Sequence, residues 1–405
     1  MNVASRVISS SPDRSAGIVL AVGVQQVFFN SLEALRGIAA LVVVFYHAMW
    51  TNPLTQLQFV QNGPLMVDFF FVLSGFVICH SYGHRIGSRS ELAKFIWLRF
   101  GRLYPLHFAF LMVFLAFEVA KWVVERQLGL VADKPAFTVN GPFALLTNLL
   151  LIHSLGLHKT LTFNYPSWSI STEFYTYVLF GVLRLALPNE RRFMLAVIAV
   201  VLSGAAILLA EQQYALVDAG PEWGFFRCSG EFFLGALTYQ AYTSLRSRVP
   251  QSASLTALMN ALPIAIVLAI VGFLSRPLTG AWPFAFPVLA AALILSVVLA
   301  SGSPMATLLQ TRPLRWLGRV SYSVYMVHAA LVWSMTQLLS IALHVPRIEL
   351  KGEHVLVTSP GWGLVLVIAY VCAVLALSEL TYQWIEEPFR ARSKRLARRW
   401  FGHAA

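Results

Sequence analysis

The chain has 405 residues, of which 58% are hydrophobic and only 12% are charged, and its mean hydropathy is +0.68. This balance excludes a soluble globular protein and is typical of a polytopic membrane protein, because apolar runs of about 20 residues are needed to cross a hydrocarbon core of about 30 Å. The formal net charge of +12 does not indicate a nucleic-acid partner, since Lys and Arg gather between and beside the apolar runs, as in cytoplasmic loops.

Residues 1–31 lack the compact apolar core and the small-residue cleavage site of a signal peptide, and we predict a loose cytoplasmic arm there. Apolar segments follow along the rest of the chain. They lie near residues 32–50, 64–81, 102–123, 142–156, 167–187, 193–210, 223–243, 258–275, 284–301, 317–343 and 361–385.

The fourth segment, 142–156, is the weakest, because it is short and is interrupted by Asn148 and His153. If it does not span, the arginine-rich loops all fall on the side of the basic tail, as the positive-inside bias requires. We therefore predict an all-α integral membrane protein, a bundle of about ten transmembrane helices with both termini cytoplasmic. Residues 142–156 would form a re-entrant or interfacial segment at the outer face. The membrane domain would cover 32–390, and 391–405 would form a basic cytoplasmic tail.

The first predicted span contains Arg36 and, eleven positions later, His47. In a helix the two groups would be separated by roughly 16 Å along the axis, at about 1.5 Å per residue. One would then lie at a membrane surface and the other near mid-depth. An ionisable side chain in hydrocarbon is a functional candidate. The alternatives are a headgroup anchor for Arg36 and a structural hydrogen bond for His47.

Arg99 and Arg102 are three residues apart and would lie close to one face of a helix. The planar fork of arginine binds phosphate oxygens in a bidentate manner, so this pair and Arg36 would form a phosphate site at the cytoplasmic face. The alternative is that the pair only anchors the helix by the positive-inside rule.

The segment PSWSISTE places Glu173 about one turn into a span, behind several hydroxyl groups that include Ser167. The carboxylate could stabilise the imidazole of His47, as in many general-base sites, or bind a sugar hydroxyl. The alternative is helix capping, since a serine ahead of an acidic residue is a capping pattern.

Four further ionisable positions fall within spans. Asp68 could face the substrate cavity or serve as counter-ion to an arginine of the bundle, and His328 could line the same cavity or satisfy a helix contact. Arg227 is four residues before Glu231, which favours an intrahelical ion pair.

Taken together, six blocks resemble the acyltransferase-3 family, the multispanning membrane O-acyltransferases of bacterial surface polysaccharides. The blocks are, in order, LEALRGIAALVVVFYH, VDFFFVLSGFVI, RFGRLYP, PSWSISTEFY, GRVSYSVYMVH and IEEPFR. The resemblance covers about residues 31–390. It implies transfer of an acyl group, usually acetyl, from cytoplasmic acyl-CoA to a hydroxyl of an exopolysaccharide, lipopolysaccharide or other lipid-linked glycan, at the bacterial inner membrane.

By position, the resemblance implies that His47 is the family's essential histidine and that Arg36 is the basic residue beginning its motif. Arg99 and Arg102 match the arginine pair associated with the donor, and Glu173 matches the acidic residue of the Ser-Trp-Ser block. The resulting hypothesis is that the three arginines bind the coenzyme phosphates while His47 takes the proton of the attacking hydroxyl.

The expected partners are acyl-CoA, a glycan acceptor, membrane lipids and glycan-assembly proteins. We expect no bound cofactor and no metal site, because transfer from a thioester chiefly requires positioning and a base. The alternative function is a transporter or flippase of a lipid-linked sugar that uses His47, Asp68 and Glu173 as a proton relay. Three arginines clustered at one face favour the enzyme.

Overall fold

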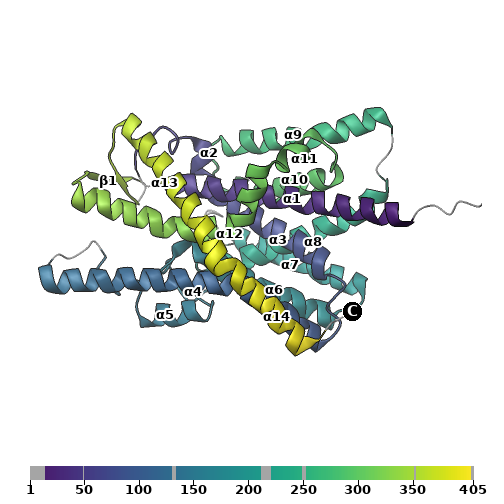
Figure 1. Cartoon of the computed structure of the whole chain (residues 1–405), viewed down its shortest axis with the longest axis horizontal. Helices are drawn as coiled ribbons and strands as arrows, with labels where there is room; N and C mark the ends of the chain where they lie inside the picture. The colour runs from purple at the N-terminus through teal and green to yellow at the C-terminus, as the bar shows by residue number, and fades with distance from the viewer. Residues whose placement is uncertain are drawn as a thin grey trace, which may run out of the picture.

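Long helices make up most of the protein (Figure 1). The computed structural model describes residues 14–48, 50–129, 134–210, 220–248, 252–350 and 353–402, and of residues 14–29 the backbone alone. The α-helices are α1 Arg14–Tyr46, α2 Gln58–Gln61, α3 Met66–Tyr82, α4 Arg89–Leu128, α5 Pro142–Leu149, α6 Trp168–Ala186, α7 Glu190–Ala210, α8 Gly224–Leu245, α9 Ala253–Leu274, α10 Phe286–Leu299, α11 Pro304–Leu309, α12 Arg312–Gln337, α13 Pro360–Thr381 and α14 Glu387–Phe401.

Short elements extend or connect these helices. Two π-helical turns continue α12 and α13. The short elements are η1 Gly63–Leu65, η2 Tyr165–Ser167, η4 Arg246–Arg248, η5 Trp282–Ala285, η6 Leu338–Ala342, η7 Tyr382–Glu386 and the strands β1 Arg347–Leu350 and β2 Glu353–Leu356.

Each of the ten predicted spans coincides with one of these helices, which confirms a multi-pass, all-helical membrane architecture. By length and composition, seven of the described helical stretches can cross a membrane: 63–82, 89–128, 190–210, 253–274, 282–299, 312–342 and 360–401. Helices α6 and α8 are not among the seven, and both carry buried polar side chains such as Thr176 and Arg227. The count of ten spans and the cytoplasmic side of the termini stay predictions.

Helix α5 has eight residues, a length of roughly 12 Å at about 1.5 Å per residue. This is too short for a hydrocarbon core of about 30 Å. The prediction that residues 142–156 do not form a spanning helix is confirmed.

The N-terminal segment differs from the predicted loose arm. Helix α1 already begins at Arg14 and runs without interruption to Tyr46. The physical reason is that the stretch AGIVLAVGVQQVFF contains no proline that would interrupt helix propagation.

Glycines allow two close helix pairs at the centre of the bundle. Helix α1 packs along α12 and α3 packs along α8. A Cβ added at Gly37 of α1 would lie 2.7 Å from the backbone nitrogen of Gly318 of α12. Gly75 of α3 is covered in the same way by the carbonyl oxygen of Phe232, on α8. Small residues at such crossings let backbones approach closely, which is how helices associate in lipid.

The end of the bundle opposite to the start of α1 carries an antiparallel ribbon of β1 and β2 (Figure 1). The chain after α1 is fixed to it: Trp50 bridges Leu356, and the Trp50 Nε1 donates to the Gly363 carbonyl at 3.1 Å. The start of α1 and the end of α14 both lie at the other end of the molecule in Figure 1.

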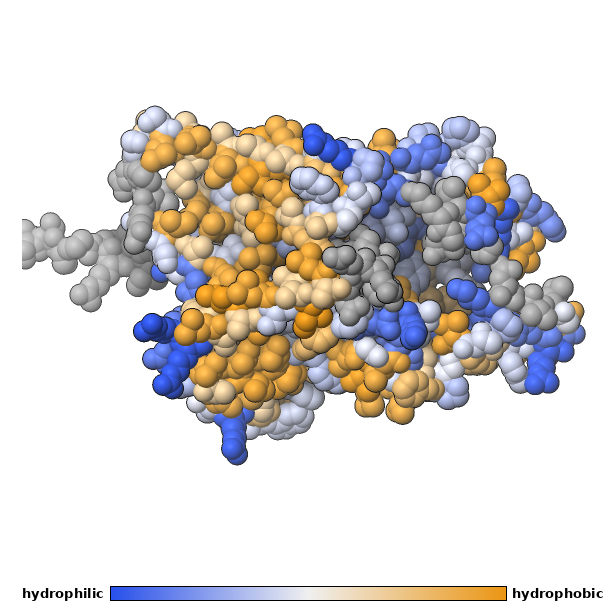
Figure 2. Space-filling view, turned by 180° about the vertical axis from the view of Figure 1, so that it is seen from behind, coloured by the Kyte–Doolittle hydropathy of each residue, from blue (hydrophilic) through white to orange (hydrophobic). Residues whose placement is uncertain are grey.

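Large apolar side chains are exposed around the bundle. Figure 2 shows a broad hydrophobic surface over the middle of the molecule and hydrophilic residues toward its ends. Exposed examples on different helices are Leu202, Leu268 and Ile368. In a soluble protein such a surface would be an aggregation liability, whereas lipid requires it.

Substituting Gly75→Ala should destabilise the fold by about 3 kcal/mol, because the new methyl group would overlap the Phe232 carbonyl oxygen and force the two backbones apart. Unfolding in mixed micelles, followed by circular dichroism, measures the effect. The control is Gly272→Ala on α9, where nothing lies within 4 Å of the added methyl group. That variant should be neutral or slightly stabilising. Equal stabilities of the two variants would contradict the close α3–α8 contact.

Candidate functional site

Four predicted site residues line one cavity, called here the inner chamber. Its volume is about 130 Å³, and α1, α3, α4, α6 and α12 contribute to its wall. The four residues are Arg36, Arg99, Arg102 and Glu173. Apolar side chains of α3, among them Phe70 and Val77, complete the lining. The structure therefore brings together the three arginines that the sequence grouped, and it adds the carboxylate to them.

A buried carboxylate holds Arg102 in the chamber wall. The Arg102 Nη1 lies 3.8 Å from Glu386 Oε1, and the side chain of Glu386 is fully buried. The other oxygen of Glu386 accepts a hydrogen bond from Ser323 Oγ at 3.0 Å. Arg36 is held by α12 as well, since its Nε donates to Ser321 Oγ at 3.1 Å. Sequence reasoning did not assign Glu386 to the site, although the IEEPFR block contains it.

Arg99 and Glu173 meet across two tyrosines. The Arg99 guanidinium lies over the Tyr82 ring, 5.4 Å from its centroid, and 6.0 Å from the centroid of Tyr177. The Tyr177 hydroxyl donates to Glu173 Oε1 at 2.6 Å and lies 2.8 Å from Ser74 Oγ. The tyrosines thus fix the carboxylate within the chamber, next to the cations.

His47 and His328 form a second group, called here the imidazole pair. Their ring centroids are 4.9 Å apart, and Tyr165 lies against His47 with a centroid distance of 5.1 Å. The His47 Nδ1 is 2.9 Å from the Val43 carbonyl oxygen. A carbonyl only accepts, so Nδ1 carries the proton and the lone pair is on Nε2. His328 is fully buried, and neither ring nitrogen has a hydrogen-bond partner among the described residues.

Tyr325 separates the imidazole pair from the inner chamber. It lines the chamber, and its ring lies 5.8 Å from that of His328. Its hydroxyl accepts from Ser169 Oγ and donates to the Pro166 carbonyl oxygen, each at 3.0 Å. Glu173 bonds to Tyr177 and not to His47.

Asp68 lies outside both groups, as a counter-ion within the bundle. Its two carboxylate oxygens accept from Arg227 Nε at 2.7 Å and Arg227 Nη2 at 2.9 Å, and both side chains are buried. The predicted pair of Arg227 and Glu231 is present at 4.0 Å, longer than the contact with Asp68. The Trp168 ring covers the same guanidinium at 5.4 Å. The geometry assigns to Asp68 the counter-ion alternative rather than a place in the cavity wall.

Ser167 does not line the chamber. Its hydroxyl lies 3.2 Å from His153 Nε2, and its carbonyl oxygen lies 3.1 Å from the same nitrogen. No side-chain capping bond from Ser167 to the α6 backbone is present among the described residues. Ser167 therefore links the start of α6 to the loop after α5.

A second cavity, called here the vestibule, adjoins the inner chamber. Its volume is about 550 Å³. It shares Glu33, Arg36 and Arg102 with the chamber, so the two cavities are contiguous. Its wall is completed by Asn30, Arg312, Arg315, Trp316, Arg319, Tyr382 and Arg390. Among the described residues, six arginines and one carboxylate, Glu33, thus line this space. Sequence analysis treated the arginines of α12 only as loop charges, although their spacing of three and four residues could have identified one cationic helix face.

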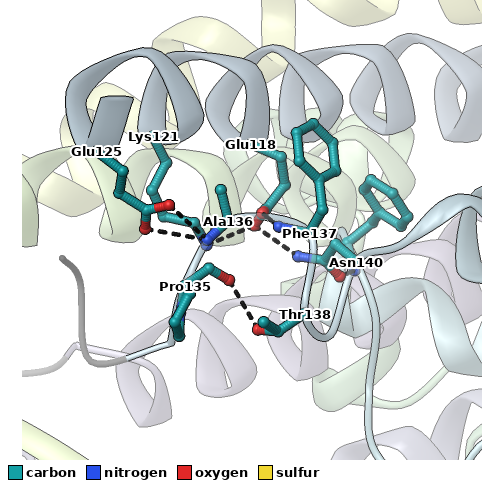
Figure 3. Close-up of polar contacts among 9 residues, drawn as sticks. Glu118, Lys121, Glu125, Pro135, Ala136, Phe137, Thr138 and Asn140 are labelled. Atoms are coloured by element: carbon teal, nitrogen blue, oxygen red, sulfur yellow. Dashed lines mark hydrogen bonds and ion pairs between the residues drawn. The ribbon is translucent and has the colours of Figure 1, made fainter. Parts of the chain in front are cut away.

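Two carboxylates of α4 anchor the loop that precedes α5 (Figure 3). Glu118 accepts hydrogen bonds from Lys121, from the Phe137 amide and from Asn140 Nδ2, at 2.8 to 2.9 Å. Glu125 accepts from the Ala136 amide with both of its oxygens at 3.0 Å. These carboxylates hold a loop in which Phe137 adopts a positive φ of 61°, a conformation that needs support from its surroundings.

Hydrogen bonds link this loop to the segment that contacts His47. Asn140 Oδ1 accepts from the Phe163 amide, and Asn164 Nδ2 donates to the Met326 carbonyl oxygen at 3.1 Å. Tyr165, the next residue, is the one that lies against the His47 ring. The position of this tyrosine thus follows from the contacts of Glu118 and from those of α12.

Comparison with known proteins gives a family. The model of a family described as an acyltransferase domain matches residues 29–379. No solved structure is significantly similar to the chain.

Three curated relatives show how widely the similarity extends. The protein YrhL of Bacillus subtilis (strain 168), provisionally named a peptidoglycan O-acetyltransferase, is 27% identical over 402 residues, which are 93% of this chain and 57% of YrhL. The protein BcsY of Komagataeibacter xylinus, provisionally named a membrane-bound transacylase, is 27% identical over 74% of this chain and 72% of its own length. The peptidoglycan O-acetyltransferase OatA of Listeria monocytogenes is 23% identical over 90% of this chain and 56% of its own length. The chain thus spans little more than half the length of YrhL and of OatA.

Replacing Asp68→Asn should destabilise the protein by about 3–5 kcal/mol, because the buried Arg227 guanidinium would lose its closest counter-charge. Denaturation in mixed micelles measures the loss. The control is Glu190→Gln, which breaks a half-exposed ion pair with Arg184 at 3.3 Å and should cost less than about 1 kcal/mol. If the Asp68→Asn variant is stable but binds its ligand more weakly, Asp68 belongs to the binding site and is not only a counter-ion.

Replacing Glu118→Ala should speed hydrogen exchange of the 134–141 amides about ten-fold or more, because bonds to a charged acceptor contribute about 1.5–3 kcal/mol each. Exchange followed by mass spectrometry measures this. The control is Lys121→Ala, which leaves the Glu118 bonds to the loop in place. Unchanged exchange in Glu118→Ala would show that the loop does not depend on this carboxylate.

Proposed function

The chain belongs to the acyltransferase-3 family, and from this premise we propose that it is a membrane O-acyltransferase. The donor is a coenzyme A thioester, and the acceptor is a hydroxyl group of a glycan. The observation that carries the proposal is the juxtaposition of an arginine-lined chamber with an imidazole pair, separated by one tyrosine side chain. One group binds anions and the other can move a proton.

The positive charge of the two cavities supports an anionic donor. Arg36 and Arg102 line both the vestibule and the chamber, and Arg99 lines the chamber. Guanidinium groups bind phosphate oxygens through charge-assisted bonds, which are about twice as strong as neutral ones. A coenzyme A thioester is a donor that carries phosphates at one end and its reactive carbonyl at the other, on a flexible arm. The donor would enter from the cytoplasm, with its thioester end directed toward His47.

The tautomer of His47 supports its role as the base. The Val43 carbonyl holds the proton of His47 on Nδ1, so Nε2 can accept the proton of an attacking hydroxyl. As the oxygen bonds to the thioester carbonyl carbon, this proton passes to Nε2. The carbon–sulfur bond then breaks, and the departing thiolate takes the proton from the imidazolium, which leaves an ester and free coenzyme A. His328, next to His47, is placed to orient the imidazole or the hydroxyl.

The names of the relatives support a glycan acceptor. Two of the relatives carry the name of a peptidoglycan O-acetyltransferase and one that of a membrane-bound transacylase. A glycan acceptor and an acetyl group therefore fit this chain best. With the apolar exposed surface of the bundle, they indicate a multi-pass enzyme of the bacterial inner membrane whose acceptor approaches from the outer face.

Replacing His47→Ala should abolish acetyl transfer, a fall of at least about 100-fold given the usual contribution of general-base catalysis, while membrane insertion stays normal. Purified protein in nanodiscs, supplied with labelled acetyl-CoA and a glycan acceptor, provides the assay. The control is His84→Ala, which removes an exposed imidazole from the loop after α3. Retained transfer in His47→Ala would remove this residue as the base, and absent transfer in the unsubstituted protein would contradict the proposed function itself.

A further inference from the structure

Four of the six vestibule arginines lie outside the chamber and have no part in the mechanism above. Arg312, Arg315 and Arg319 come from the first two turns of α12, and Arg390 comes from α14. Arg319 is within 3.6 Å of Glu379, and Arg390 is within 2.6 Å of Glu387. Arg312 and Arg315 form no ion pair with any residue that the structure describes.

The local structure makes this concentration of charge unfavourable without a ligand. Arginines 312, 315 and 319 follow a spacing of three and four residues, so they share one face of α12, where like charges repel. The start of a helix also carries a partial positive charge and prefers acidic neighbours. Helix α12 has no acidic residue in its first turn, and Thr311, its N-cap, makes no side-chain capping bond. A bound anion would relieve both effects.

The vestibule also has the shape and the neighbours of a site for the nucleotide end of a coenzyme. It adjoins the chamber through Arg36 and Arg102, so one ligand can occupy both spaces. Trp316 lines the vestibule, and its Nε1 donates to Glu379 Oε2 at 2.7 Å, which fixes the indole ring. Fixed aromatic rings of this kind stack with nucleobases.

We infer that the vestibule binds the phosphorylated adenosine end of the donor, with Arg312 and Arg315 directed at its 3′-phosphate. Arg36 and Arg102, deeper in, face the diphosphate, and the pantetheine arm enters the inner chamber. This inference rests on the proposed function and adds to it a donor preference: the arginines of α12 distinguish coenzyme A from its 3′-dephospho form.

Steady-state transfer in nanodiscs of neutral lipid tests the preference with two donors, acetyl-CoA and 3′-dephospho-acetyl-CoA. The variant combines Arg312→Gln with Arg315→Gln. Its KM for acetyl-CoA should rise about ten-fold or more, as expected for the loss of charge-assisted bonds to phosphate. Its KM for the dephospho donor and its kcat should each change by less than about two-fold. The matched control combines Arg398→Gln with Arg399→Gln, which removes the same charge from the exposed end of α14 and should change neither KM.

Binding without turnover separates this inference from the proposed function. Adenosine 3′,5′-bisphosphate, titrated calorimetrically, should bind the unsubstituted protein and bind the Arg312→Gln, Arg315→Gln variant about ten-fold or more weakly. Such binding with no acetyl transfer would contradict the proposed function and leave the vestibule as a nucleotide-phosphate site.

Two results would overturn the inference. One is an Arg312→Gln, Arg315→Gln variant that keeps its KM for acetyl-CoA or loses both donors equally. The other is a double variant that binds adenosine 3′,5′-bisphosphate as tightly as the unsubstituted protein does but binds phosphatidylglycerol more weakly. That result would assign the vestibule to a lipid headgroup.

Discussion

Burial of arginine charge inside an apolar bundle is the constraint that organises this protein. The Arg102 guanidinium on α4 reaches Glu386 at the end of η7, and the Arg227 guanidinium on α8 reaches Asp68 on α3. A charge in a low-dielectric interior is costly unless a partner or a polar cavity faces it. The two carboxylates therefore fix which helices must be neighbours. Helices that are apolar on all sides could otherwise pack in several registers with similar energies.

The two ion pairs differ in how completely they satisfy the cation. Asp68 binds Arg227 through two short hydrogen bonds, and neither residue lines the chamber or the vestibule. Glu386 approaches Arg102 only to 3.8 Å, and the arginine faces both the chamber and the vestibule. The first pair serves stability. The second leaves hydrogen-bonding capacity for an anion, which is the property that a donor site requires.

The charge and polarity of the residues that form the site change along the bundle. Arginines dominate at the vestibule, arginines and the carboxylates of Glu33 and Glu173 line the inner chamber, and aromatic and imidazole rings follow beyond Tyr325. Helix α1 contributes to both ends, with Arg36 in the cationic region and His47 directly after its last turn. An extended donor would pass from charge recognition to proton transfer along this helix. The loop held by Glu118 closes the far end and supports Tyr165 against the base.

The sequence by itself predicted the helical segments, the short α5 and the grouping of Arg36, Arg99 and Arg102, because hydropathy and helical spacing are local properties of the chain. It did not determine which of Asp68, Ser167 and Glu173 face the cavity. All three are polar residues near the start of a helix, yet Asp68 pairs with Arg227, Ser167 bonds to His153, and Glu173 enters the chamber. It also gave no sign that the arginines of α12 share a cavity with Arg36. These outcomes depend on contacts between residues that are 14 to 285 positions apart in the sequence. Only the tertiary packing, which decides where each buried charge finds its partner, could settle them.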